Sequence, residues 1–302
     1  MKALLVGLGI WGTLWYERLT EHKDVRLTGA VDADKQKWKD DTGVRFFDDA
    51  EKAMDILKPD FILNATPPVA HKKINDLAFD RNIPVLSEKP IAEEHEDVLH
   101  IVNRAADGQR LMIAENYRYV PQIRKIKNCL EDSKAGVIKE VNILFQQTHH
   151  IDNYHMTMKH PMLMDVGIHH LDMLRYFTGS DAKTVNAQFR IPAGSWYNGY
   201  SNAELRILMQ NGVNATYSGS LDADVIDSSW YGTWTFICEN DTLRFEPEDG
   251  NVNTGLDAVL DSFLDYLHNG TMPETHISDN YKTYQIAHAA ICSFSTGKDI
   301  TI

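Results

Sequence analysis

Residues 1–12 constrain the fold of this 302-residue chain more than any other stretch. Residues 2–6 form a short apolar run that stops at Gly7, which is typical of a buried parallel strand. Gly7, Gly9 and Gly12 follow the spacing G-x-G-x-x-G, and apolar residues at helical spacing come after them. A strand, a glycine turn and a helix in this order predict a site for a dinucleotide, whose phosphates would face the helix N-terminus.

A second apolar run, residues 27–31, ends in Asp32, about 20 residues after the glycine turn. A carboxylate at that place accepts hydrogen bonds from the adenosine ribose and repels a 2′-phosphate, so we expect NAD as the cofactor. Lys35 and Lys37 just beyond it could soften the preference over NADP. The alternative for Asp32 is a helix N-cap or a loop aspartate, but the strand, glycines and helix around it favour the ribose-binding interpretation.

The composition excludes several classes of protein. Hydrophobic residues make up 43% of the chain and charged residues 24%, as in an ordinary globular protein, and the length suggests two domains. The net charge of −13 argues against nucleic acid or an anionic membrane as a partner. Cys129, Cys238 and Cys292 are far apart and predict neither a disulfide framework nor a zinc site. We expect a cytoplasmic protein, because no apolar run could span a bilayer and the first strand leaves no room for a leader.

Strands and helices alternate in the first part of the chain. We expect further strands at 44–47, 61–64, 84–86 and 111–114, and helices at 48–57, 71–81 and 93–107. Pro67 and Pro68 should keep the chain from entering a helix at once. Such alternation predicts an α/β fold with an N-terminal, dinucleotide-binding Rossmann domain, residues 1–120, built on a mostly parallel sheet.

The pattern changes near residue 121. A helix at 123–130 leads into strands with period-2 alternation at 137–147, 185–191, 203–209, 213–218 and 234–238, followed by helices at 256–267 and 281–294. Residues 121–302 are therefore expected to form a C-terminal α/β domain for substrate binding and oligomerisation, with a large, mainly antiparallel open sheet. If helices cover only one face of it, the other face exposes apolar area, from which we expect a homodimer or homotetramer.

Four polar residues, Asp32, Thr66, Lys89 and Asn116, follow the ends of predicted strands. Ligands of parallel sheets bind beyond the carboxyl ends of the strands, so we expect these side chains on one rim. A lysine held there, away from bulk water, can take part in proton transfer. The alternative for Lys89 is an ordinary surface lysine.

Residues 162–177 have the periodicity of a helix. On such a helix Asp165, His169 and Asp172 stand at i, i+4 and i+7 and share one face, while His170 is turned about 100° away. A histidine flanked by carboxylates is a natural proton acceptor. Taken alone, a solvated polar face explains the pattern better, and a divalent metal site is a second alternative, although we expect no metal.

Together these pieces resemble the glucose–fructose oxidoreductase/inositol dehydrogenase family, abbreviated Gfo/Idh/MocA. The matching motifs are the glycine turn, Asp32, residues 65–68 with His71, Glu88-Lys89-Pro90, residues 116–118 and Asp165-x-Gly167-x-His169-x-x-Asp172. The resemblance implies NAD(P)-linked oxidation or reduction of a sugar, a polyol or a related carbonyl compound. It also implies that His169 takes the proton from the substrate hydroxyl, that Lys89 holds and polarises the same oxygen, and that Asp165 orients the group.

The resemblance further implies two sets of binding residues. Those for the cofactor are Gly7, Gly9, Ile10, Trp11, Gly12, Asp32, Thr66, Pro67, His71, Glu88, Lys89 and Asn116. Those for a carbohydrate-like substrate are Lys89, Tyr117, Arg118, His155, Asp165 and His169. Residues 149–155, which include His149 and His150, carry no clear sugar-type signature, so the substrate stays open. A non-catalytic NAD(P)-binding sensor of the same fold and an NAD-assisted glycosidase are the alternatives, and the presence of both Lys89 and His169 favours an enzyme over a sensor.

Overall fold

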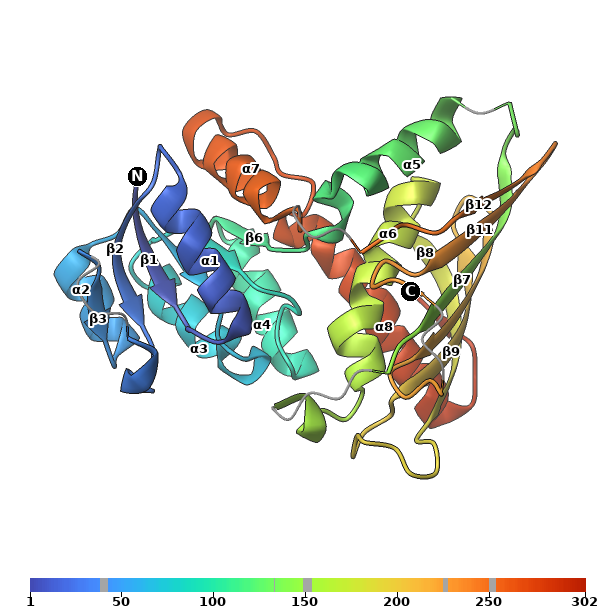
Figure 1. The fold of residues 1–302 in the computed structure, drawn as a ribbon, viewed down its shortest axis with the longest axis horizontal. Helices are drawn as coiled ribbons and strands as arrows, with labels where there is room; N and C mark the ends of the chain where they lie inside the picture. The colour runs from blue at the N-terminus through green and yellow to red at the C-terminus, as the bar shows by residue number, and fades with distance from the viewer. Residues whose placement is uncertain (39–42, 133, 149–153, 225–227, 250–253) are drawn as a thin grey trace. The chain divides into compact units, whose positions relative to one another are not determined.

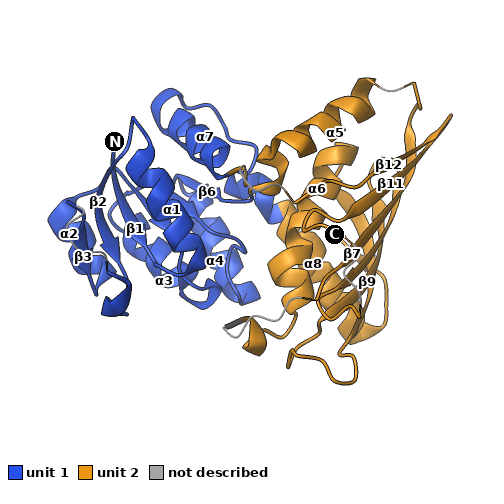
Figure 2. Ribbon diagram, in the orientation of Figure 1, with its two compact units in different colours: residues 1–115, 256–281 blue, residues 116–255, 282–302 orange. Residues whose placement is uncertain are grey.

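The computed structural model describes residues 1–38, 43–132, 134–148, 154–224, 228–249 and 254–302. Its contacts divide the chain into two compact units (Figure 2). Unit 1 consists of Met1–Glu115 and Leu256–Tyr281, and unit 2 of Asn116–Gly255 and Lys282–Ile302. This grouping differs from a simple division at residue 120, because the segment 256–281 returns to the first unit.

The returning segment is tied to the last strand of unit 1 by backbone and side-chain contacts. Met112 pairs with His276 in an isolated antiparallel bridge, and the hydroxyl of Thr275 donates to the carbonyl of Ile113 at 2.8 Å. Phe263 meets Phe61 of the sheet edge-on, with ring centroids 5.4 Å apart. These long-range contacts leave no local pattern in the sequence, which is why a division by sequence alone misses them.

Unit 1 is built on a sheet of parallel strands in the order β3-β2-β1-β4-β5-β6 (Figure 1). Its strands are β1 Lys2–Val6, β2 Arg26–Val31, β3 Arg45–Phe47, β4 Phe61–Asn64, β5 Val85–Ser87 and β6 Leu111–Ile113. Every residue of β4, β5 and β6 is buried. A parallel strand covered on both faces must be apolar throughout, and this explains the continuous apolar runs in the sequence. The predicted Rossmann-type sheet is confirmed.

The helices of unit 1 are α1 Ile10–Glu21, α2 Ala50–Leu57, α3 Pro68–Phe79, α4 His95–Ala106 and α7 Leu256–Asn269, with a short 3-10 turn, η1, at Lys35–Lys37. Helix α1 packs on β1 and β2 and beside α7, whereas α3 packs on β4 and β5 and beside α2 and α4. The expectation that Pro67 and Pro68 delay the third helix is wrong. Helix α3 begins at Pro68, with Pro67 as its N-cap residue, because a proline in the first helical position lacks only an N–H that has no intrahelical acceptor.

Unit 2 is built on a mixed sheet in the order β12-β11-β7-β10-β9-β8-β13 (Figure 1). Its strands are β7 Ile138–Gln146, β8 Ala182–Arg190, β9 Asn202–Met209, β10 Asn214–Ser220, β11 Thr233–Cys238, β12 Thr242–Phe245 and β13 Ile300–Thr301. The pair of β7 and β10 is parallel, and the other pairs between these strands are antiparallel. The mainly antiparallel sheet expected from period-2 alternation is confirmed.

The helical segments of unit 2 are η2 Tyr117–Tyr119, α5 Pro121–Asp132, η3 Tyr154–Thr157, the π-helical turn η4 Met162–Gly167 and α6 Ile168–Thr178; α8, Ile277–Thr296, begins in unit 1 and contributes most of its length to unit 2. Helices α5, α6 and α8 lie on one side of the sheet (Figure 2). Phe177 of α6 meets Trp234 edge-on at 5.0 Å, and Phe294 of α8 meets Phe189 at 5.3 Å. No helix among the described residues combines the length and the apolar character needed to cross a membrane.

The opposite face of this sheet is polar in its central strands. Along β8, β9 and β10 the side chains alternate between buried and solvent-accessible, and the accessible positions carry Gln188, Arg190, Glu204, Arg206 and Thr216. The hydroxyl of Ser218 donates to Glu204 at 2.8 Å across two of these strands. These strands therefore do not present the exposed apolar face from which we expected a homodimer or homotetramer. The assembly itself stays a prediction.

One buried imidazole in unit 2, that of His160, packs against two aromatic rings. His160 stacks on Tyr200 at 5.0 Å and meets Phe189 edge-on at 4.9 Å, and neither of its ring nitrogens has a hydrogen-bond partner among the described residues. Burial lowers the pKa of His160 from 6.5 to about 4. Between these two pH values the unfolded chain binds the proton and the folded chain does not, so this residue makes the fold less stable as the pH falls through that window.

We predict that His160→Phe keeps the aromatic packing, removes two orphaned polar atoms and raises the free energy of unfolding by about 1–2 kcal/mol. The gain should increase as the pH falls below 6.5, because the wild-type histidine is then protonated on unfolding. Urea unfolding at pH 7.5 and 5.5 measures both effects. His170→Phe is the matched control: His170 is buried but has two hydrogen-bond partners, so its loss should destabilise the fold. A His160→Phe variant that is less stable than wild type at both pH values would contradict the prediction.

Candidate active site

Close backbone packing requires glycine at two positions of the glycine turn in unit 1. Gly7 has φ +98°, and a Cβ built on it would lie 2.5 Å from the carbonyl oxygen of Ala65. A Cβ on Gly12 would lie 2.1 Å from the carbonyl oxygen of Gly7, so α1 sits directly on the turn. By contrast, a Cβ on Gly9 would meet nothing within 4 Å. Gly9 is the N-cap residue of α1, so open surface lies beside the helix N-terminus, and this fits the pyrophosphate of a dinucleotide.

The first turns of α1 and α3 add exposed apolar side chains next to the glycine turn and the loop after β4. Ile10 is 65% exposed and Val69 is 71% exposed, although both are large aliphatic residues. Trp11 is half-buried beside Ile10, and Pro67 is exposed. Ile10, Trp11 and Pro67 belong to the predicted cofactor set. Val69 does not, although it lies exposed in the first turn of a helix that follows a strand of the parallel sheet.

Asp32 links the end of β2 to the glycine turn. One carboxylate oxygen accepts from the backbone N–H of Leu8 at 2.7 Å, and the other accepts from the N–H of Asp34 at 2.9 Å. The ammonium of Lys37 lies 3.2 Å from both oxygens. The N-cap of the following turn η1 is Asp34 and not Asp32, which removes one alternative interpretation of Asp32.

His71 ties two loops at the carboxyl edge of the sheet to each other. Its Nε2 lies 2.8 Å from the carbonyl oxygen of Thr66, and its Nδ1 lies 2.8 Å from the carbonyl oxygen of Pro90. The pKa of His71 is lowered, and burial is the largest cause of this shift. A neutral imidazole has one N–H and can donate to one of these carbonyls at a time. His71 thus joins the loop after β4 to the loop that holds Lys89.

The loop after β5 holds two ionisable side chains that are buried. Glu88 is 6% exposed and Lys89 is 9% exposed, which excludes the interpretation of Lys89 as an ordinary surface lysine. The indole N–H of Trp15 in α1 donates to Glu88 Oε1 at 2.7 Å, and the backbone N–H of Lys89 donates to Glu88 Oε2 at 3.2 Å. The peptide bond between Lys89 and Pro90 is cis. In the sequence Trp15 is only one of the apolar residues at helical spacing after the glycine turn, and nothing in that pattern shows that its N–H reaches Glu88.

The surroundings of Glu88 make its charge depend on pH near neutrality. Burial raises the pKa of Glu88 from 4.5 to about 7, against the opposing effects of the Trp15 hydrogen bond and the Lys89 charge. Between pH 4.5 and 7 the folded chain therefore keeps a proton that the unfolded chain has lost. In this window the contribution of Glu88 to stability falls as the pH rises, and it stays low above pH 7.

A second group of predicted site residues lies in unit 2, where the helical pattern is interrupted. We expected one α-helix over residues 162–177, but Met162–Gly167 forms a π-helical turn and α6 begins at Ile168. A π turn has i→i+5 hydrogen bonds, so the spacing of an α-helix does not hold across it. The expectation that Asp165, His169 and Asp172 share one helical face therefore fails at Asp165, which lies within the π turn.

The two carboxylates that flank His169 in sequence have separate partners among the basic side chains. Asp165 pairs with Nε2 of His155 at 3.1 Å. Asp172 is fully buried and accepts from the guanidinium of Arg118, at 2.7 Å from Nε and 2.5 Å from Nη2. The hydroxyl of Thr283 also donates to Asp172 at 3.0 Å. Arg118 thus has a structural partner in the fold, and its role toward a substrate stays a prediction.

His169 and His170 are adjacent in sequence but have different surroundings. The ring of His169 is buried and stacks on Tyr117, with centroids 4.0 Å and planes 9° apart. His170 lies 2.9 Å from the hydroxyl of Tyr217 through Nδ1 and 2.9 Å from the carbonyl of Trp230 through Nε2. Burial lowers the pKa of His170 to about 3. A neutral His170 can donate to the carbonyl and accept from the hydroxyl, so both nitrogens are satisfied.

Tyr197 is a further residue of unit 2 that sequence reasoning missed. It is buried, and burial together with the charges of Asp165 and Asp222 raises the pKa of its hydroxyl. A protonated phenol in the field of Asp165 is a candidate hydrogen-bond donor near the predicted catalytic residues. Its loop matches no motif, so the sequence alone offers no signal for it.

Three further predictions concern places outside these two groups. His149 and His150 lie outside the described residues. Asn116 is grouped with unit 2, where its amide donates to the carbonyl of Thr254 at 2.6 Å. Within the part of the chain that the structure describes, no cluster of three or more His, Cys, Asp or Glu side chains could hold a metal ion.

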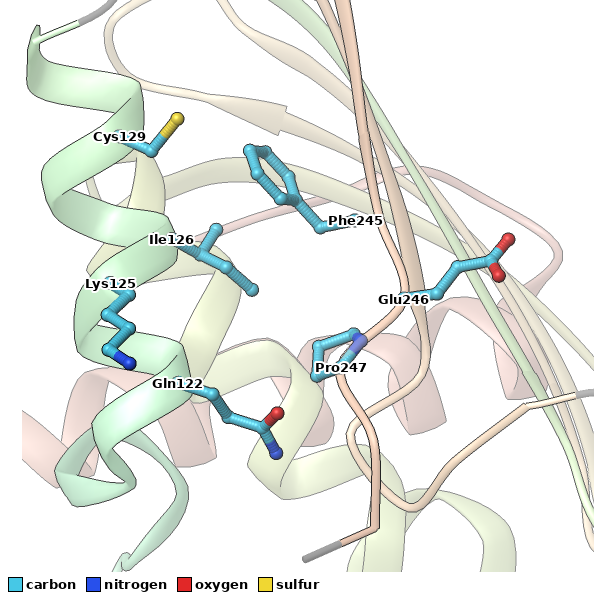
Figure 3. Close-up of a pocket in the computed structure, with 7 residues that line it drawn as sticks. All are labelled: Gln122, Lys125, Ile126, Cys129, Phe245, Glu246 and Pro247. Carbon is cyan, nitrogen blue, oxygen red and sulfur yellow. The ribbon is translucent and has the colours of Figure 1, made fainter.

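A cavity of about 370 Å³ in unit 2 contains none of the predicted site residues (Figure 3). It lies between α5 and the end of β12 and is lined by Gln122, Lys125, Ile126, Cys129, Phe245, Glu246 and Pro247. The side-chain amide of Gln122 accepts from the N–H of Glu248 at 3.2 Å and donates to its carbonyl at 2.6 Å, so the chain after β12 is fastened to α5. We assign this cavity no role in the chemistry.

We predict that Glu88→Gln removes the pH dependence that Glu88 contributes, because an amide does not ionise. The variant should gain stability relative to wild type as the pH rises from 4.5 to 7, by about 3 kcal/mol at most. Urea unfolding of both proteins at several pH values between 5 and 8 gives the difference. Trp15→Phe is the companion variant: it removes the hydrogen bond that lowers the pKa of Glu88, so the decline of its stability should continue to higher pH than in wild type. If the free energy of unfolding changed with pH in the same way in wild type and Glu88→Gln, the raised pKa of Glu88 would be ruled out.

Comparison with known proteins agrees with this arrangement. A family model described as an oxidoreductase family with an NAD-binding Rossmann fold matches residues 1–116, and a model of the GFO/IDH/MocA C-terminal domain matches residues 123–243. The chain is 23% identical to a D-apiose dehydrogenase of Rhizobium rhizogenes, over 100% of this chain and 97% of that protein. It is 22% identical to an inositol 2-dehydrogenase of Corynebacterium glutamicum, over 70% of this chain and 65% of that protein.

Solved structures share the fold over the whole chain. The crystal structure of GenD2 from gentamicin A biosynthesis, in complex with NAD, has a TM-score of 0.88 and 19% identity, over 100% of this chain and 96% of that chain. The two family models together span the glycine turn, the loops that hold Thr66 and Lys89, and the segment with Asp165 and His169. The chain therefore belongs to the Gfo/Idh/MocA family of oxidoreductases and is an NAD-dependent dehydrogenase.

Proposed function

We propose that this chain transfers a hydride between NAD and a sugar, a polyol or a related carbonyl compound, and that Lys89, Asp165 and His169 handle the accompanying proton. The observation that carries the proposal is the pair of buried groups, Lys89 in unit 1 and His169 in unit 2, each held by its own surroundings. A protein that only binds a dinucleotide has no need of such a pair. The names of the relatives, D-apiose dehydrogenase and inositol 2-dehydrogenase, support the substrate class.

The residues of unit 1 would hold the cofactor in this proposal. The open surface at Gly9 and the N-terminus of α1 would receive the pyrophosphate, and Asp32 would accept hydrogen bonds from the ribose. NAD supplies the hydride acceptor when it is bound. The loop held by Trp15 and His71 would keep Lys89 in one orientation, so that its ammonium donates a hydrogen bond to the reacting oxygen.

The residues of unit 2 would move the proton. His169 would accept it from the substrate hydroxyl as a general base, which requires a neutral imidazole. Stacking on Tyr117 fixes the plane of that imidazole. Asp165 would orient the group electrostatically, and its contact with His155 at 3.1 Å adds His155 to the same set of residues. In reduction the same groups would act in reverse, with His169 returning the proton.

The first functional prediction concerns Lys89. We expect Lys89→Met to bind NAD with an affinity close to wild type and to lose about a hundredfold or more in kcat/KM, because a positioned proton-transfer group contributes on that order. The substrate is found first with a panel of sugars, inositols and their keto forms, followed by nicotinamide absorbance. The exposed Lys73 of α3 provides the control, and Lys73→Met should leave the rate unchanged.

Three outcomes would count against this assignment. If Lys89→Met turns over near the wild-type rate, Lys89 has no part in the chemistry. If the wild-type chain binds NAD but oxidises or reduces no compound on the panel, the result favours the alternative of a non-catalytic sensor. Hydrolysis of a glycoside with no net change in nicotinamide absorbance would favour the glycosidase.

The second functional prediction separates the two adjacent histidines. His169→Asn should keep the fold and NAD binding, lose most activity and lose the acidic limb of the pH–rate profile. His170→Asn should lower the free energy of unfolding by about 1–3 kcal/mol, because it disturbs the contacts with Tyr217 and Trp230 inside the core. Kinetics across pH, together with urea unfolding of both variants, tests the contrast. A His169→Asn variant that is as unstable as His170→Asn and fully active per folded molecule would show that both histidines are structural.

A further inference from the structure

We infer that Lys37 determines how strongly this chain discriminates against NADP. The inference rests on NAD binding by unit 1 and is independent of the roles proposed for Lys89 and His169. The ammonium of Lys37 lies 3.2 Å from each oxygen of Asp32, the carboxylate that faces the adenosine ribose in this type of site. The side chain of Lys37 is nevertheless 41% exposed, so it can turn toward a ligand without leaving a buried position.

The backbone around Lys37 directs it to Asp32. Lys37 is the last residue of η1, whose N-cap Asp34 accepts from the N–H of Gln36 at 3.0 Å through its side chain. The N–H of Lys37 donates to the carbonyl of Asp34 at 3.1 Å. Asp34 in turn donates its own N–H to the Asp32 carboxylate at 2.9 Å. This short turn is therefore anchored on Asp32 at both ends.

Asp32 and Lys37 have opposite effects on a 2′-phosphate, because the carboxylate repels it and the ammonium attracts it. A lone carboxylate repels the phosphate dianion of NADP and accepts hydrogen bonds from the ribose hydroxyls of NAD. An ammonium at 3.2 Å balances that negative charge and brings three N–H donors that can bind a phosphate. Asp32 keeps its capacity to accept from a ribose, while the repulsion toward NADP is reduced. We therefore expect NAD to be preferred over NADP by a modest factor only.

Lys35 provides a matched comparison within the same turn. Its ammonium pairs with Asp48 at 3.1 Å and lies 5.3 Å from the centre of the Trp38 ring. Lys35 and Lys37 thus have the same charge and lie two residues apart, but they have different acidic partners. A general effect of positive charge on NADP would involve both lysines, whereas the mechanism inferred here involves Lys37 alone.

Equilibrium binding tests the inference without any turnover. Dissociation constants for NAD and NADP are measured by calorimetry for the wild-type protein, Lys37→Met, Lys35→Met and Asp32→Asn, at low and at high salt. Lys37→Met should weaken NADP by about tenfold and change NAD by less than about threefold, whereas Lys35→Met should change neither. Asp32→Asn should tighten NADP, because Lys37 then has no carboxylate to neutralise. The salt dependence of NADP binding should be smaller in Lys37→Met than in wild type.

Several results would overturn the inference. One is an equal loss of NAD and NADP affinity in Lys37→Met, which would make Lys37 a general support of the ribose site. Another is a loss of NADP affinity in Lys35→Met as large as in Lys37→Met. A third is a wild-type protein that already binds NADP a thousandfold more weakly than NAD, on the order of 4 kcal/mol. A chain that binds both cofactors as expected but turns over no substrate would leave this inference intact and would contradict only the proposed function.

Discussion

The close approach of α1 to the glycine turn determines where the buried polar groups of unit 1 can be held. A Cβ at Gly12 would overlap the carbonyl of Gly7, so the helix axis can come this near only because position 12 has no side chain. Trp15 follows Gly12 by one helical turn and is fully buried on the same side of α1. Its indole N–H then reaches Glu88 in the loop after β5. The helix that follows the glycine turn and the loop that holds Lys89 are thus joined by one side chain.

A second series of contacts fixes His169 within unit 2. The ion pair between Arg118 and Asp172 is buried, and burying two charges costs more than their attraction returns unless further hydrogen bonds are made. Thr283 supplies one of these, and it also accepts from Arg175 at 3.0 Å. Arg118 lies in the same short turn, η2, as Tyr117, the residue on which His169 stacks. The ion pair therefore contributes to the orientation of the imidazole, although neither of its members needs to touch a substrate.

The features that local sequence predicts and those it does not differ in their physical origin. The glycine turn, Asp32 and the strand ends with Thr66 and Lys89 were predictable, because steric needs and apolar periodicity act over a few neighbouring residues. The π turn around Asp165 was not, since its apolar pattern also fits an α-helix and its hydrogen bonds are what distinguish it. The partners of Trp15, Asp165 and Asp172 were not predictable either. They join residues of different elements of the fold, and a single sequence carries no record of such pairs.

The two adjacent histidines show how different partners can give two buried residues of one type different surroundings. Burial lowers the pKa of His170 to about 3, so it is neutral at neutral pH. A neutral His170 places no positive charge beside His169. The hydroxyl of Tyr217 and the carbonyl of Trp230 hold His170 in the core, while His169 presents its ring to an aromatic face. Stacking on Tyr117 restrains the plane of the His169 imidazole, and a fixed ring plane is what the proposed proton transfer requires.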